Sequence, residues 1–156
     1  MDTGLPVAQN IDWLYYLRQG KCFFGGTTLA ASVGNVSIVQ LFNPVASGLT
    51  ILLRMYSMSV DVAGAVVTGE YNVALTTNAG NVGPLLFGGA APVGQIRTQN
   101  PVGNLGGTRW PIDLLASTVF VTQPDWYALL PAGQGFNLQT LATNTRLRVG
   151  VLWAEF

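Results

Sequence analysis

The sequence contains no histidine, a single cysteine and few charged side chains. Of its 156 residues, seven are Lys or Arg and seven are Asp or Glu, so charged residues make up 9% and the formal net charge is zero. An ordinary soluble domain carries roughly 25% charged residues. The absence of histidine removes the commonest general base near neutral pH and the commonest metal ligand. Serine–histidine, cysteine–histidine and histidine-based zinc sites are therefore excluded.

The single cysteine and the sparse charge also bear on where the chain folds and what it contacts. Cys22 has no second cysteine with which to form an internal disulfide,. Residues 1–6 include an acid where a signal peptide has bases, and no apolar core follows them, which predicts folding in a reducing cytoplasm,. No basic patch is available to hold nucleic acid or anionic lipid. The uncharged segment 71–96 is interrupted by prolines and glycines, so it does not offer the ~20 continuous apolar residues of a membrane span,.

A surface with so little charge does not keep copies of a protein apart. Because nucleic acid and membrane are excluded, we expect protein partners to cover part of it, most simply further copies of this chain. The uncharged segment 71–96 is one expected place of contact. The segment 49–54 is another, because it is apolar on both faces and is therefore either central in a sheet or covered by another subunit,.

Gly, Pro and Asn recur along the chain and separate short segments rich in Val, Thr, Leu, Phe and Tyr, a pattern typical of a β-sandwich or barrel,. Residues 145–155 alternate most clearly and place four apolar side chains on one face: Leu147, Val149, Val151 and Trp153,. Further strands are predicted at 36–42, 49–62, 70–76, 117–122 and 136–142. Within 49–62 the apolar face switches, which predicts a β-bulge near Met55 and Tyr56.

One short helix is predicted near the N-terminus, because Ile11, Leu14 and Tyr15 follow helical spacing, with Asn10 as a candidate N-cap and Gly20 as the stop,. The segment 80–110 is predicted to be a long loop that packs against the rest of the protein. We therefore predict one all-β domain, a jelly-roll-like β-sandwich at residues 27–156, preceded by an N-terminal arm or short helix at 1–26.

The residues that could carry chemistry are scattered. A glycosidase needs two carboxyl groups in one cleft, and the acids here form no close cluster, although Asp113 and Asp125 flank a predicted strand,. We interpret both as turn or rim residues, since an acid after Pro124 suits a turn. No loop supplies enough acids for calcium, and the glycine runs at 103–107 and 133–135 lack phosphate-loop spacing. We therefore expect no enzyme activity, no catalytic residue, no metal and no cofactor.

Aromatic and large apolar side chains are the remaining candidates for binding, because such residues form interface anchors or sugar-stacking platforms. Trp153 is expected in the core, whereas the aromatic residues near the N-terminus suit core and interface equally. The interface candidates are Trp13, Tyr15, Tyr16, Leu85, Leu86, Phe87, Trp126 and Tyr127.

Three short stretches carry a resemblance to a known group of proteins. They are the turn Asn43-Pro44-Val45-Ala46-Ser47-Gly48 before an alternating strand, the turn Pro131-Ala132-Gly133-Gln134-Gly135, and the closing strand Val149-Gly150-Val151-Leu152-Trp153-Ala154-Glu155-Phe156. Together they resemble small virion proteins of tailed bacteriophages.

The resemblance implies a jelly-roll virion component that is made in the host cytoplasm. Its leading form is a capsid decoration or cement protein, which in this group is often a trimer bound to the major capsid protein. The resemblance transfers no catalytic residue. A tail, baseplate or fibre component, or a carbohydrate-binding β-sandwich module, stays open as the alternative.

Overall fold

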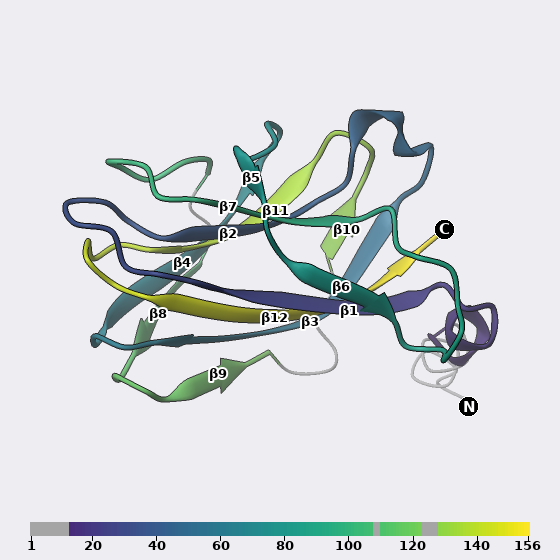
Figure 1. Ribbon diagram of the computed structural model, residues 1–156, viewed down its shortest axis with the longest axis horizontal. Coiled ribbons are helices and arrows are strands. Elements are labelled where there is room, and N and C mark those ends of the chain that lie inside the picture. The colour runs from purple at the N-terminus through teal and green to yellow at the C-terminus, as the bar shows by residue number, and fades with distance from the viewer. Residues whose placement is uncertain (1–12, 108–109, 123–127) are drawn as a thin grey trace, which may run out of the picture.

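The computed structural model describes residues 13–107, 110–122 and 128–156. It consists of two antiparallel sheets that pack against each other (Figure 1). The first sheet contains β1 (Cys22–Leu29), β3 (Ile51–Val60), β6 (Asn81–Pro84), β9 (Val119–Val121), β10 (Ala128–Leu130) and β12 (Leu147–Glu155). The second contains β2 (Ile38–Phe42), β4 (Gly64–Tyr71), β5 (Thr77–Asn78), β7 (Gln95–Gln99), β8 (Trp110–Leu114) and β11 (Gly135–Thr140). Residues 13–18 are helical, and a short 3-10 helix, η1 (Val45–Ser47), precedes β3.

In both sheets, a strand from the C-terminal part of the chain lies between two strands from its N-terminal half: β12 between β3 and β1, and β11 between β2 and β4. The first sheet has the order β10-β3-β12-β1-β6, with β9 also paired to β3. The second sheet has the order β5-β7-β2-β11-β4-β8. The framework strands β1-β12-β3-β9 and β2-β11-β4-β8 thus form the two sheets of a jelly roll. The predicted all-β sandwich is confirmed.

The core lies between the sheets, and the closing strand β12 supplies much of it. Its four alternating apolar side chains are all buried, as the sequence predicts, and Trp153 is fully enclosed. The Trp153 ring lies 6.0 Å from that of Phe23 on β1. Across the sandwich, the ring centroids of Tyr56 on β3 and Phe136 on β11 lie 5.5 Å apart. Each such side chain contributes about 1.5–3 kcal/mol through burial of apolar surface.

A β-bulge in β3 explains the change of apolar face. Leu152 of β12 lies opposite Met55, whereas the next residue, Trp153, lies opposite Leu53, so Arg54 is the extra residue. The buried positions accordingly pass from Leu53 to Tyr56. The predicted bulge is confirmed, one residue earlier than expected. The bulge also turns the Arg54 side chain away from the core, and its guanidinium lies 4.6 Å from the Trp13 ring centroid. β3 is an inner strand of its sheet.

The strand predicted at 70–76 is wrong beyond Tyr71, where β4 ends. The backbone that follows is held by a side chain instead of a strand. Gln40 Nε2 donates hydrogen bonds to the carbonyl oxygens of Tyr71 and Val73, at 3.3 and 3.2 Å. The Leu75 N–H donates to Gln40 Oε1 at 3.1 Å. The alternation of apolar residues therefore continues past the end of the sheet.

The long loop predicted at 80–110 is also wrong, because it contains two strands. β6 pairs with β1, and β7 pairs with β2. Buried and half-buried residues alternate in β7, but of its two buried residues, Ile96 and Thr98, only Ile96 is apolar. Pro84 ends β6 at the edge of its sheet, where proline is tolerated,. These strands are too short and too poor in apolar residues to stand out in the sequence.

The N-terminal helix is confirmed where the structure describes it, at residues 13–18. Gly20 has a φ of +67°, a left-handed conformation that ends helices and suits glycine, as predicted,. Asn10 and Ile11, the predicted beginning of the helix, lie outside the described residues. β1 starts at Cys22, within the range that the sequence assigns to the arm.

Candidate interaction surface

Nowhere in the described ranges do three or more His, Cys, Asp or Glu residues come together in a group that could hold a metal ion. Asp113 is exposed on the edge strand β8, and its proposed partner Asp125 lies outside the described residues. Over those same ranges, no helix has the length and hydropathy needed to cross a membrane.

Two segments that are far apart in the sequence meet at one end of the sandwich, beside the C-terminus (Figure 1). The helix 13–18 leads directly into β1, and the segment after β6 returns to the same place. The Leu85 N–H donates a hydrogen bond to the carbonyl of Cys22 at 2.9 Å. The Leu86 side chain reaches Gly20, at 3.5 Å from the position that a Cβ would take there. Both segments contain predicted interface residues.

The helical turn divides its aromatic residues between contact and exposure. Tyr16 stacks on Phe156 with ring centroids 5.4 Å apart and an interplanar angle of 22°. Tyr15 meets Tyr16 edge to face but leaves 58% of its own surface exposed. Trp13 is half-buried beside Arg54. Tyr15 is therefore the member of this group that presents a ring to the outside.

The segment after β6 presents Phe87 in a tight turn. The Gly89 N–H donates to the Leu86 carbonyl at 2.9 Å. Gly88 has a φ of +78°, which gives the turn type II geometry with Phe87 at its second position,. Phe87 is fully exposed, and Leu85 and Leu86 beside it are exposed as well. The turn thus holds the backbone of Phe87 in a conformation that exposes its large apolar side chain to solvent.

We call the exposed large apolar side chains of these two neighbouring segments the helix-end patch: Leu14, Tyr15, Leu85, Leu86 and Phe87. Two exposed bases, Arg18 and Lys21, accompany it on the same helix and at its end. The Glu155 carboxylate nearby is turned inward and accepts hydrogen bonds from the Val93 and Gly94 N–H groups. Among the described residues, the patch is therefore apolar with a basic rim.

Four of the five residues of the helix-end patch are interface candidates in the sequence analysis; Leu14 is not. Trp126 and Tyr127 lie outside the described residues. Leu14 is exposed at the patch, although we predicted it only as part of the helix's apolar spacing. Phe24 was missed: it is half-exposed on the outer face of the first sheet. Its neighbour Phe23 is buried, and in a strand two consecutive aromatic residues point to opposite faces, so this exposure could have been inferred.

Comparison of the chain with known protein families, curated proteins and solved structures finds no match.

The turns at residues 43–48 and 131–135 are joined by hydrogen bonds. Asn43 is fully buried, and its Nδ2 donates to the carbonyls of Leu49 and Leu130, at 2.8 and 2.9 Å. The second turn packs directly on it, since the Gly133 N–H donates to the Asn43 carbonyl at 2.8 Å. Asn43 thus ties the connection between β2 and β3 to the turn that leads into β11. These two turns therefore help to hold the framework of the sandwich together.

Proposed function

We propose that this chain is a structural protein of a bacteriophage virion. In this proposal it associates with copies of itself, as a trimer, and binds the lattice of the major capsid protein as a decoration or cement protein. The observation that carries the proposal is the helix-end patch. A fully exposed phenylalanine on a glycine-fixed turn, beside an exposed tyrosine and leucines, is the kind of anchor that buries itself in a partner,.

The edges of the sheets favour association through such a patch. β6 and β8 are edge strands that contain Pro84 and Pro111. At another edge, β5 has two residues. Proline and short edge strands hinder the addition of a further strand. Side-chain contacts are therefore the favoured route by which this sandwich would associate with another protein.

The resemblance and the composition support the same proposal. The two interlocked turns and the closing strand match the pattern of small phage virion proteins on a sandwich framework. The low charge of the chain, 9%, is unusual for a protein whose whole surface meets water,. A surface that is shared with neighbouring subunits accounts for it.

Self-association is tested by light scattering on the full chain during size-exclusion chromatography. We expect a multiple of the 16.5 kDa chain mass, and three copies if the trimer is correct. Phe87→Asp places a charge in the buried interface and should shift the protein to the monomer. Val33→Asp is the matched control, because Val33 is almost fully exposed in the loop after the opposite end of β1. A wild-type monomer at micromolar concentration contradicts self-association.

Lattice binding is tested by mixing the purified protein with phage capsids that lack their decoration protein. We expect co-sedimentation and a higher temperature of capsid disruption, both reduced by Phe87→Asp and retained in Val33→Asp. Absence of both effects with the oligomeric wild-type protein would contradict the capsid role.

A further inference from the structure

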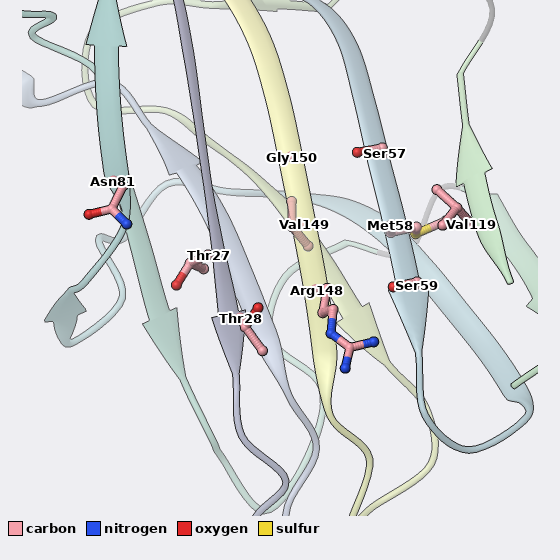
Figure 2. A pocket seen from close by; sticks show the side chains of 10 residues that line it. All are labelled: Thr27, Thr28, Ser57, Met58, Ser59, Asn81, Val119, Arg148, Val149 and Gly150. Carbon is pink, nitrogen blue, oxygen red and sulfur yellow. The ribbon is translucent and has the colours of Figure 1, made fainter. Parts of the chain in front are cut away.

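A shallow trough crosses the outer face of the first sheet (Figure 2). Its volume is about 420 Å³. Gly150 of β12 lies in its floor, and the pairing register places Gly26 of β1 directly opposite Gly150. Asn81 of β6 flanks Gly26, and Ser57 of β3 flanks Gly150. This row of small residues spans three inter-strand gaps, or roughly 14 Å.

A second row of polar side chains runs beside the floor. The pairing register places Arg148 of β12 between Thr28 of β1 and Ser59 of β3, and Figure 2 shows its guanidinium between these two hydroxyl side chains. Within the described part of the chain, the structure gives these three side chains no hydrogen bond or ion pair. Among the residues that the structure describes, no acid lines the trough. One cation and a set of hydroxyl groups are therefore available to a ligand.

An aromatic ring lies beside the trough on the same strand face. Phe24 and Thr28 lie an even number of positions apart along β1, so both side chains point to the outer side of the sheet,. Phe24 is 52% exposed. Its ring lies against β6, with ring atoms 3.6 and 3.7 Å from the position that a Cβ would take at Gly83. The ring offers an apolar face next to the polar rows.

We propose that this trough binds an acidic oligosaccharide, that is, a short chain of sugars that carry carboxylate groups. Arg148 pairs with a carboxylate, and Thr28, Ser57, Ser59 and Asn81 hydrogen-bond to sugar hydroxyls. The glycine floor lets a sugar ring approach the sheet, and Phe24 contacts the apolar face of a ring. A neutral sugar would leave Arg148 unpaired. An extended peptide gains its affinity from main-chain hydrogen bonds at a sheet edge, which this face does not offer.

The site is independent of the proposed role in capsid assembly, since it shares no residue with the helix-end patch. A monomeric Phe87→Asp variant should bind the saccharide as the wild type does. Failure of one proposal therefore leaves the other standing.

The experiment follows backbone amide signals of the ¹⁵N-labelled full chain by NMR during titration. The probes are trimers of galacturonate, mannuronate and guluronate, the methyl ester of each trimer, and acetate. We expect saturable shifts at Gly26, Ser57 and Gly150 with at least one of the acidic trimers, and weaker binding of its uncharged methyl ester.

Three variants locate the contact. Arg148→Gln should weaken binding about tenfold or more, because it removes the charged partner. Arg146→Gln is the matched control: it removes the same charge from an exposed arginine just before β12 and should change affinity less than about twofold. Gly150→Ala fills the floor and should also weaken binding. Its Cβ would meet only the Ser57 Oγ, at 2.9 Å, and a hydroxyl can rotate away.

Several results overturn the proposal. They are the absence of shifts with all three acidic trimers, equal binding of the methyl esters, equal shifts with acetate alone, and equal loss of binding in Arg146→Gln and Arg148→Gln. Dispersed spectra of each variant establish that it is folded.

Discussion

The carboxylate of Glu155 holds the backbone of Gly94, because Oε1 accepts a hydrogen bond from the Gly94 N–H at 2.7 Å. The same carboxylate accepts two further hydrogen bonds: Oε2 accepts one from the Val93 N–H at 3.0 Å, and Oε1 accepts one from Trp153 Nε1 at 3.0 Å. A Cβ at Gly94 would lie 2.8 Å from Ile51 Cδ1 and 3.1 Å from Glu155 Oε1. The last strand therefore fixes the segment that enters β7, and a side chain at Gly94 would crowd the Ile51 side chain and the Glu155 carboxylate.

Glu155→Gln should destabilise the fold by about 1–3 kcal/mol. The substitution replaces one carboxylate oxygen by an NH₂ group, which would face N–H donors and leave a buried donor unsatisfied. The free energy of unfolding, measured in urea by circular dichroism, gives the loss. Asp113→Asn is the control, because Asp113 is exposed on β8 and the same change of charge there should alter stability by no more than about 0.5 kcal/mol,. Equal effects of the two substitutions would show that the contacts of Glu155 do not stabilise the fold.

Gln40→Leu should cost about 2 kcal/mol or more of unfolding free energy. Leucine has a similar volume, but it leaves the Leu75 N–H and the Tyr71 and Val73 carbonyls without the partner that the amide provides,. Hydrogen exchange adds a local test, since the Leu75 amide should lose protection beyond the global change. Gln99→Leu on the neighbouring strand β7 is the matched control, because Gln99 is only half-buried. Unchanged protection of Leu75 in Gln40→Leu would contradict the role of the amide.

Cys22 should make stability fall between pH 9 and pH 11. Burial raises the pKa of its thiol from 9.0 to about 11, against the opposing influence of the Arg54 charge. The folded protein therefore keeps the thiol proton in a range where the unfolded chain has lost it. This contribution is complete below pH 9 and declines as the pH rises towards 11.

The thiol contribution is isolated by comparing the wild type with Cys22→Ala at each pH. The difference in unfolding free energy should stay constant from pH 6 to 8 and shrink by about 1–2 kcal/mol by pH 11. A difference that is constant over the whole range would mean that the thiol titrates alike in the folded and unfolded chains.

Local patterns in the sequence determined those features of the secondary structure that can be predicted without knowing which segments pack together. The four alternating apolar residues of β12 predict a strand with one buried face, because side chains on a strand alternate with a period of two. Gly20 predicts the end of the helix, since its left-handed backbone conformation suits glycine,. The switch of apolar face in 49–62 predicts the bulge, which the structure places at Arg54.

Only the tertiary structure decided what covers the second face of each strand. Gln40, Asn137 and Gln139 alternate with buried apolar residues, and such positions ordinarily meet water, yet all three are fully buried. Asn137 Nδ2 donates a hydrogen bond to the Leu105 carbonyl, and Gln139 Oε1 accepts one from the Leu105 N–H. These side-chain amides thus bond to the backbone of a loop as a neighbouring strand would. Periodicity reports the direction of a side chain but not the segment that meets it.

The same reason applies to the helix-end patch and the trough. Each is made by residues far apart in the chain: the helix and Phe87 in one, and Asn81, Gly26, Gly150 and Ser57 in the other. Their juxtaposition depends on which strands pair and in which register, and that choice minimises the free energy of the whole core rather than of any one segment. The sequence by itself determined that this chain is a β-sandwich with little charge. The folded structure alone decided where its surface offers contacts.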